Sequence, residues 1–435
     1  MTNYKYINDY LILKYYFLVS VILSSCSSFL WAELGSKADM QRPVSTSYEP
    51  LLINQALSTA LETHPLIHSR LGDYEASMSD LDAARWSRFP TISTAAQTAL
   101  DGLDQTSAGV IQPIWSGGRL SGQVESALAR SNMALADIDD ARQIVLTDTA
   151  NSFLELNRAL IKEDIAQSNV VEHQRLFEII QRRALAATSP DVDVQLADAR
   201  LSYAKSQELQ VTSSSEIARS QLEQLIGIEV KDIISPSEPK MTIDLLSELE
   251  SSAIAYSPRL RQLRSKSQNL KAEVKVASSV LYPQVSLGYE RQFGQLLFAQ
   301  EREQIFLSVE FQPGAGMSAR ALTSAANSRL IANQNEIEAA ERELRRQVQI
   351  AWQEREAARN QLLPSRRLVS ATKEVVESYL RQYTVGRKSW LDVLNAQREF
   401  VQAEFTLSDY RALLLNSSYR LQILSGSLPL QEMLN

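Results

Sequence analysis

The sequence predicts a mainly α-helical fold with a small β part, arranged as an internal tandem repeat. Glycine and proline are scarce, with 14 and 13 in 435 residues, and neither occurs between positions 123 and 189. The stretch 317–385 contains only Pro364, the one residue that interrupts this second run. Because a usual helix has about 11–12 residues, such runs exclude a Rossmann fold, a TIM barrel or a β-sandwich as the main architecture.

Charge and composition exclude several classes of function. Lysine and arginine number 44 against 51 aspartate and glutamate, which gives a net charge of −7. Without a basic excess to neutralise phosphates, we expect no nucleic-acid partner. One cysteine and three histidines rule out a disulfide framework within the chain and leave little for a metal centre. We find no nucleophile–base pair, so we expect neither an enzyme nor a cofactor.

The N-terminus predicts export from the cytoplasm. Residues 1–32 have the form of a signal peptide, with lysines ahead of the apolar stretch 15–23. That stretch is too short to span a membrane as a helix. Cleavage after Ala32 is one interpretation, and lipidation of Cys26 in a lipobox-like context is the other. No later segment has 18 consecutive apolar residues, so we expect no membrane-spanning helix.

Matching landmarks recur along the chain and indicate a duplication. They are separated by 193 residues near the start of each repeat and by 199 residues near its end. The pairs are Pro65 and Pro258, Pro90 and Pro283, Asp193 and Asp392, and Gly227 and Gly426. We therefore expect repeat 1 over 51–228, a linker over 229–241 and repeat 2 over 242–427.

Each repeat has the same predicted order of elements. Alternating apolar and polar residues predict two strands within about 90–115 and two within about 283–312. A long helix follows over about 117–186 in repeat 1 and about 318–384 in repeat 2, and then a tight turn and a second helix. At 1.5 Å per residue, each long helix would extend roughly 100 Å.

Four strands per chain are too few to close a barrel in a membrane. Open strand edges are not tolerated in lipid, and the smallest outer-membrane barrels have about eight strands. At least two chains would therefore have to combine. The alternative is a secreted, soluble coiled-coil interaction protein whose alternating segments form a water-exposed hairpin.

Two sequence segments resemble a known family. They are Ile-Gln-Pro-Ile-Trp-Ser-Gly-Gly-Arg at 111–119 and Tyr-Thr-Val-Gly-Arg-Lys-Ser-Trp-Leu-Asp-Val-Leu-Asn-Ala at 383–396. With the duplication, they make residues 51–427 resemble the TolC-like outer-membrane factors. The resemblance implies a homotrimer in the outer membrane of a Gram-negative bacterium, with a transmembrane β-barrel completed by trimerisation and a long-helix α-barrel forming a periplasmic tunnel. It also implies a periplasmic adaptor, an inner-membrane ABC or RND-type pump and contact with outer-membrane lipid as partners.

The same resemblance suggests a gate at the helix-to-helix turn of repeat 2. Tyr383 and Asp392 match the family's gate residues. The family's arginine falls on Lys388 and its second aspartate on Asn395. Lysine lacks the bidentate fork of arginine, so the way in which the gate would lock is left open.

Further acidic residues are candidates for the pore. Asp193 is the repeat 1 counterpart of Asp392, and Asp191 lies close by. Symmetry copies would crowd carboxylates around the pore axis, which favours cations and raises some carboxylate pKa values. The alternative is structural, with Asp191 as a helix N-cap and Asp392 stabilising the first turn of a helix.

The tips of the long helices are the expected adaptor-binding surface, at Ala184, Ala187, Val385 and Gly386. Gly386 suits a turn that needs a positive φ, and Ala187 at the paired site predicts that the two tips are unequal. The alternative is a plain turn without a partner. For the cargo, the turn at 312–316 resembles the branch that exports large adhesins by type I secretion, and drug or metal efflux is the alternative.

Overall fold

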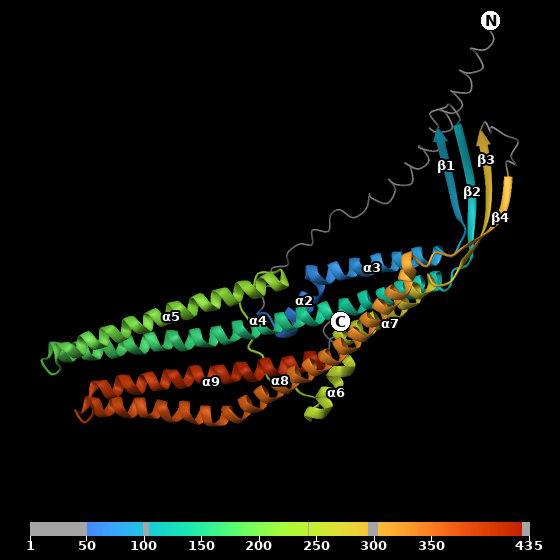
Figure 1. The fold of residues 1–435 in the computed structure, drawn as a ribbon. Coiled ribbons are helices and arrows are strands. Elements are labelled where there is room, and N and C mark those ends of the chain that lie inside the picture. The colour runs from blue at the N-terminus through green and yellow to red at the C-terminus, as the bar shows by residue number, and fades with distance from the viewer. Residues whose placement is uncertain (1–49, 99–103, 242, 295–302, 429–435) are drawn as a thin grey trace, which may run out of the picture. The chain divides into compact units, whose positions relative to one another are not determined.

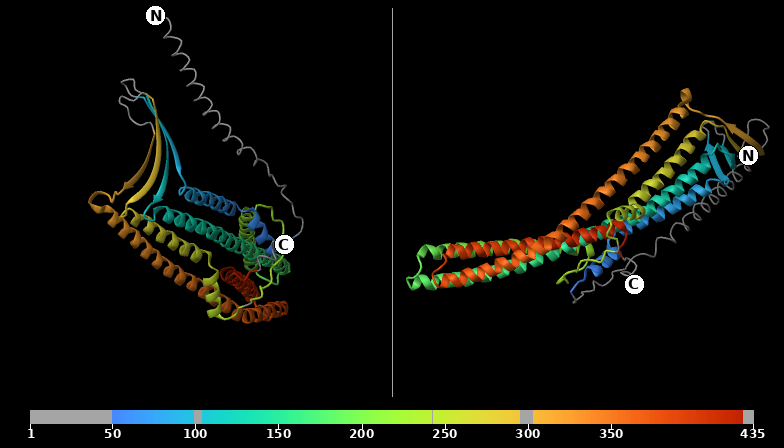
Figure 2. Two further views of the ribbon diagram at one scale, coloured as in Figure 1. Left: turned by 90° about the vertical axis from the view of Figure 1, so that its right-hand side faces the viewer. Right: turned by 90° about the horizontal axis from the view of Figure 1, so that it is seen from below.

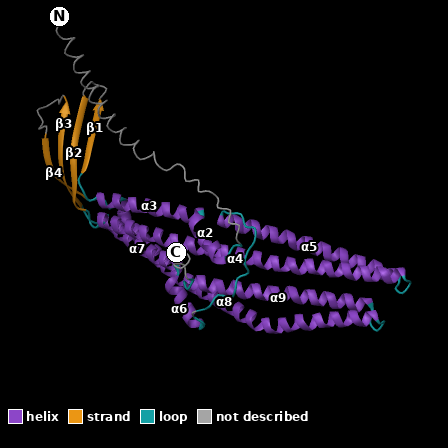
Figure 3. Cartoon of the chain, turned by 180° about the vertical axis from the view of Figure 1, so that it is seen from behind, coloured by secondary structure: helices purple, strands orange, loops and turns teal. Residues whose placement is uncertain are grey.

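The fold is mainly helical with one small antiparallel sheet, as the sequence predicts (Figures 1 and 3). The computed structural model describes residues 50–98, 104–241, 243–294 and 303–428. The expected signal peptide with Cys26 lies outside these residues.

Each repeat contributes one hairpin to a four-stranded sheet. The strands are β1 (Thr91–Thr98), β2 (Asp104–Trp115), β3 (Gln284–Gly294) and β4 (Glu303–Glu310). Their order in the sheet is β1-β2-β3-β4, and all neighbours are antiparallel. The two repeats join where β2 pairs with β3, for example at Val110 opposite Tyr289. Strands β1 and β4 are left as the two edges.

The helices next to the sheet follow the order of the strands. They are α3 (Pro65–Trp86), α4 (Arg119–Leu185), α7 (Pro258–Ser279) and α8 (Ser318–Thr384). Contacts run from α3 to α4, from α4 to α7 and from α7 to α8. This order is expected because each helix continues into its own strand. Both α3 and α7 have 22 residues and carry proline at the first position, where the missing N–H costs nothing.

Two helices return from the far ends of α4 and α8. Helix α5 (Asp191–Ile226) packs on α4, and α9 (Trp390–Ser425) packs on α8. Because α4 also contacts α9, the order here is α5-α4-α9-α8. Within the compact unit of residues 47–435, the sheet lies at one end and the two helix turns lie at the other (Figure 2).

Two short helices were not anticipated, α2 (Ile53–Thr63) and α6 (Leu246–Tyr256). Each precedes α3 or α7, and they pack on α4 and α8 respectively. The largest apolar core cluster includes Leu57 of α2, Phe153 of α4 and Leu222 of α5. These packed segments therefore lie beside the middle of the long helices.

Pro364 does not end the long helix that the sequence predicts over about 318–384. Helix α8 is continuous over 67 residues with Pro364 inside it, although Figure 1 shows that the helix bends along its length. A proline removes one backbone hydrogen bond and usually bends a helix. Here the packing of α8 on α9 stabilises the helix on both sides of Pro364. No helix in the described residues is both long and apolar enough to cross a membrane.

Candidate functional site

The turns between α4 and α5 and between α8 and α9 have the same backbone geometry. In the first, the amide nitrogens of Ala187 and Thr188 donate to the carbonyl oxygens of Ala184 and Arg183 at 2.9 and 2.8 Å. In the second, the amides of Gly386 and Arg387 donate to the carbonyls of Tyr383 and Gln382 at 3.0 and 2.9 Å. Both are Schellman motifs, which end a helix by satisfying its last carbonyls.

The left-handed residue of each turn lies at the paired position. Gly386 has φ 74°, which confirms the expected positive φ. Ala187 has φ 55°, so the expectation that alanine makes the two tips unequal is wrong for the backbone. The two Schellman hydrogen bonds hold Ala187 there despite a cost of about 1–2 kcal/mol for an L-residue in this region.

The tip of repeat 2 is built around two buried aromatic rings. Tyr383 and Trp390 are 6% and 3% exposed, and their ring centroids are 5.4 Å apart. They belong to a cluster, here called the tip cluster, that α4, α5, α8 and α9 all supply. Its members are Leu176, Ile180, Ala197, Tyr383, Trp390, Val393 and Leu394. The Tyr383 hydroxyl and the Trp390 indole N–H find no hydrogen-bond partner among the described residues.

Arg183 links the two repeats at this point. Its guanidinium carbon lies 4.6 Å from the centroid of the Tyr383 ring, and its Nη1 donates to the Tyr383 carbonyl oxygen at 3.3 Å. Arg183 is not among the residues predicted from the sequence. Two signals could have found it: it is basic in the last turn of a helix, where cations are favoured, and it precedes Ala184, the repeat 1 counterpart of Tyr383.

Asp392 completes a capping box at the start of α9. Its Oδ2 accepts from the Ser389 backbone N–H at 3.1 Å and from the Ser389 hydroxyl at 2.8 Å, while its own N–H donates to Ser389 Oγ at 3.2 Å. These bonds, with a smaller effect of the Lys388 charge, lower the pKa of Asp392 from its ordinary value. Within one chain this direction is opposite to the rise expected from carboxylate crowding.

The acidic residues of repeat 1 are arranged differently. Asp193 Oδ2 accepts from the Ser189 hydroxyl at 3.1 Å in the first turn of α5. Asp191 is the first residue of α5 and Pro190 is its N-cap, so the alternative role of Asp191 as N-cap is wrong by one position. The structure therefore places Asp193 and Asp392 at separate helix starts, each bonded to its own serine.

The remaining gate candidates lie around the turn of repeat 2. The Lys388 ammonium is 4.3 Å from the centroid of the Tyr379 ring, a cation–π geometry. Asn395 is half-buried on α9. Neither residue joins the aromatic pair of Tyr383 and Trp390.

Both tips expose large apolar side chains. Leu185 is 85% exposed and Val385 is 68% exposed, and Val192 and Leu391 are also exposed at the starts of α5 and α9. Of the four residues expected to bind an adaptor, Ala187, Val385 and Gly386 are exposed and Ala184 is half-buried. The turns thus present apolar side chains beyond the tip cluster.

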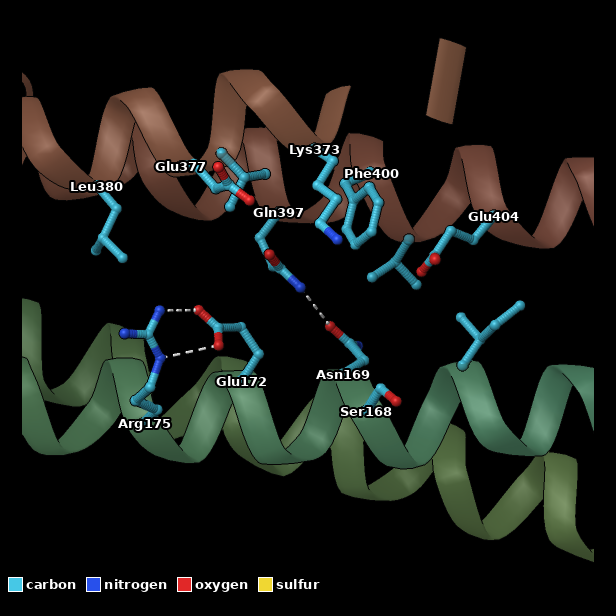
Figure 4. Close-up of a pocket in the computed structure, with 13 residues that line it drawn as sticks. Ser168, Asn169, Glu172, Arg175, Lys373, Glu377, Leu380, Gln397, Phe400 and Glu404 are labelled. Atoms are coloured by element: carbon cyan, nitrogen blue, oxygen red, sulfur yellow. Dashed lines mark hydrogen bonds and ion pairs between the residues drawn. The ribbon is translucent and has the colours of Figure 1, made fainter. Parts of the chain in front are cut away.

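A pocket of about 270 Å³ lies farther along the same helices, between α4, α8 and α9 (Figure 4). Across it, the Gln397 amide donates to Asn169 Oδ1 at 3.3 Å and joins the two repeats. Burial raises the pKa of the Glu404 carboxyl, and the charge of Lys373 opposes this rise. No group of three or more His, Cys, Asp or Glu in the described ranges could hold a metal ion.

Comparison with known proteins points to one family. The sequence profile described as "Outer membrane efflux protein" matches residues 56–228 and 249–427, which are two segments covering most of the chain. No curated protein sequence matches significantly.

Solved outer-membrane channels have the same fold. The chain is similar to the outer-membrane channel OprN, with 20% identity, a TM-score of 0.77 and coverage of 86% of this chain and 89% of that one. It is also similar to the outer membrane protein VceC of Vibrio cholerae, with 16% identity, a TM-score of 0.74 and coverage of 86% of this chain and 96% of that one. The Campylobacter jejuni outer membrane channel CmeC is similar as well, with 15% identity, a TM-score of 0.75 and coverage of 87% of this chain and 88% of that one.

Proposed function

Because this chain belongs to the outer membrane efflux protein family, and is therefore an outer-membrane channel and not an enzyme, we propose that it works as a homotrimer forming one export duct. The family resides in the outer membrane of Gram-negative bacteria and has a large periplasmic helical part. A soluble coiled-coil interaction protein, the alternative that the sequence alone left open, is excluded by this membership.

The observation that supports closure with neighbouring copies is the pair of free edges on every layer of the chain, and the number of three copies follows from the family. Strands β1 and β4 have no outer neighbour among the described residues, and β4 of one copy can pair with β1 of the next. Beside the sheet the helical layer has its edges at α3 and α8, and toward the tips its edges are α5 and α8. Both carry large exposed apolar side chains, which are Tyr203, Leu209 and Ile217 on α5 and Leu322, Ile331 and Leu363 on α8. Contact between copies would bury these groups.

We propose that the tips form the gate of this duct. Opening at the tips requires the α4–α5 pair and the α8–α9 pair to move apart, so the contact of Arg183 with Tyr383 has to break. Asp191, Asp193 and Asp392 would supply the negative charge of the narrow pore. Lys388 and Asn395 stand where the family has an arginine and an aspartate, which supports a gate held differently, with Arg183 as its basic partner.

The outer end of the tips, with its exposed apolar side chains, is the proposed docking site for a periplasmic adaptor. Leu185 and Val385 are exposed beyond the tip cluster, and Ala184, Ala187 and Gly386 leave room for a close approach of another backbone. The channel has no energy source of its own, so an inner-membrane ABC or RND-type pump would drive transport through the adaptor.

For the cargo, we propose type I secretion of a large protein such as an adhesin. Its support is the resemblance of the turn at 312–316, where Gly314 and Gly316 both have positive φ. Efflux of drugs or metals is the other outcome of the test. Deletion of the gene should remove a surface adhesin and leave drug and metal sensitivity unchanged, whereas increased sensitivity with normal adhesin would favour efflux.

The pore assignment has its own experiment. Replacing both acids, Asp193→Ala with Asp392→Ala, should weaken cation selectivity in planar bilayers because the carboxylates near the axis are lost. Asp82→Ala on α3 removes an exposed acid away from the tips and serves as the control. Unchanged selectivity in the double variant would exclude these two residues from the pore.

A further inference from the structure

The register of the sheet gives it one mainly apolar face and one mainly polar face, with Ile111 and Phe306 as apolar exceptions on the second. Directly opposite residues of an antiparallel pair share a face. One row across the four strands consists of Ile92, Val110, Tyr289 and Ile305. The neighbouring row on the other face consists of Ser93, Gly109, Glu290 and Gln304. In a barrel the first face must meet lipid and the second must line the lumen.

A charged pair stands at one end of the apolar face. Leu287 opposite Leu307 and Tyr289 opposite Ile305 are followed on the same face by Arg291 opposite Glu303. The Arg291 Nη1 and Glu303 Oε1 atoms are 3.1 Å apart, and each side chain is about half exposed. The Arg291 guanidinium carbon also lies 5.2 Å from the centroid of the Phe293 ring. On this face the apolar residues are thus followed by the ion pair and then by Phe293, whose ring the guanidinium contacts.

The other end of the band is marked by aromatic residues. Trp115 and Tyr282 pack edge to face where the strands meet the helices, with ring centroids 6.2 Å apart, and both are exposed. Phe311 directly follows β4 and is exposed as well. Tryptophan and tyrosine favour membrane–water interfaces, so this end lies at the inner surface of the membrane.

The length of the band places the charged pair at the opposite surface. Glu303 precedes Phe311 by eight residues, about 27 Å along a strand at about 3.4 Å per residue. With a strand tilt of about 35–45°, this gives roughly 20 Å across the membrane, close to the apolar band of about 25 Å in outer-membrane barrels. Arginine is costly at the midplane of a bilayer and tolerated near its surfaces. Arg291 and Glu303 therefore lie at the level of the outer headgroups.

We propose that Arg291 binds the phosphate group of an outer-leaflet lipid, with Glu303 and Phe293 positioning its guanidinium. A guanidinium has five N–H donors, more than the contact with Glu303 uses. Its planar fork matches a phosphate in a bidentate manner. The inference rests on the proposed barrel, because lipid reaches this face only when the sheet is part of one.

The test compares the protein in vesicles of phosphatidylcholine with and without a minority of bisphosphorylated lipid A. The readout is the midpoint temperature at which the trimer dissociates. Lipid A should raise the midpoint for the wild type, R291Q should lose the rise, and R291K should keep part of it. R342Q, which removes an exposed arginine of α8, should keep the full rise. An equal rise in R291Q would overturn the proposal.

Two further arms identify the source of the phosphate and guard against misfolding. Inorganic phosphate added to phosphatidylcholine vesicles should not raise the midpoint, and a rise equal to that with lipid A would overturn a lipid site. Spin labels at Cys variants of Leu287 and Phe293, made with Cys26→Ser, should report hydrocarbon depth at 287 and headgroup depth at 293. Equal depths would overturn the placement even if R291Q failed to assemble.

The same samples separate this proposal from the proposed function. A trimer that conducts ions in a planar bilayer but shows no response to lipid A contradicts only the lipid site. A wild-type protein that forms neither a trimer nor a conducting pore contradicts the export duct itself.

Discussion

Residues 183–193 and 382–392 occupy equivalent places in the two repeats and form turns with the same two backbone hydrogen bonds. Aligned position by position, the two segments share a single identical residue, Asp193 with Asp392. The turns differ sharply in their side chains, since Tyr383 and Trp390 correspond to Ala184 and Asp191. The duplication has therefore kept a backbone motif while the chemistry of the two tips diverged.

The divergence divides the tip between the repeats. Repeat 2 supplies the aromatic rings of the tip cluster, and repeat 1 supplies Arg183, which covers the Tyr383 ring. The start of α9 has a full capping box, whereas the start of α5 has no side-chain cap. The two turns share their backbone geometry but differ in their side-chain contacts. This difference can be tested by paired substitutions.

The largest effect is expected at the aromatic residue that repeat 1 lacks. Tyr383→Ala removes a buried ring, and such a change costs about 3–5 kcal/mol. It should show as faster hydrogen exchange of the amides at both tips, because the cluster draws on four helices. Tyr383→Phe is the matched control. It should change stability by no more than about 1 kcal/mol, since the hydroxyl has no partner among the described residues.

A different result for the control would be informative. If Tyr383→Phe were as damaging as Tyr383→Ala, the hydroxyl would have to bond to a group outside one chain, for example in a neighbouring copy. The tip cluster would then be incomplete in the single chain.

The sequence predicts the elements of this fold far better than it predicts the contacts of the tips. The long helix expected over about 318–384 runs from Ser318 to Thr384, because glycine and proline mark its ends. The fixed offset also pairs the two turns correctly. Arg183 could not be placed on Tyr383 in this way, since that contact depends on how two helices 200 residues apart lie side by side. The positive φ of Ala187 could not be predicted either, because backbone hydrogen bonds impose it against the conformational preference of alanine.

The second prediction compares the two serines ahead of α5 and α9. Ser389→Ala removes the capping box and should cost about 1 kcal/mol. Ser189→Ala removes only a hydrogen bond to the Asp193 carboxylate and should stay within about 0.5 kcal/mol. Chemical denaturation followed by hydrogen exchange at the tips measures both changes. Equal losses would mean that the two helix starts are capped alike and would contradict the comparison.

Acidity provides an independent check on the same cap. The Ser389 bonds lower the pKa of folded Asp392, so this carboxylate stabilises the tip above its unfolded pKa of about 3.9. The stabilisation is lost as the pH falls through the lower, folded value. The protection of the amides at the start of α9, measured relative to their intrinsic exchange rates, should therefore decrease with acid in this range, and Asp392→Asn should remove that dependence. A wild type whose cap is insensitive to acid would exclude the capping box in solution.

The smallest effects are expected at the left-handed residues, and they should have opposite signs. A Cβ at Gly386 would meet nothing within 4 Å, so Gly386→Ala pays only the left-handed backbone cost of about 1–2 kcal/mol. The lower entropy of alanine in the unfolded chain offsets about 0.4–1 kcal/mol of this, which leaves a net loss near 0.5–1 kcal/mol. Ala187→Gly reverses both terms and should stabilise repeat 1 by a similar amount. Two losses, rather than a loss and a gain, would show that the Ala187 side chain is needed by a contact that the shared backbone motif does not provide.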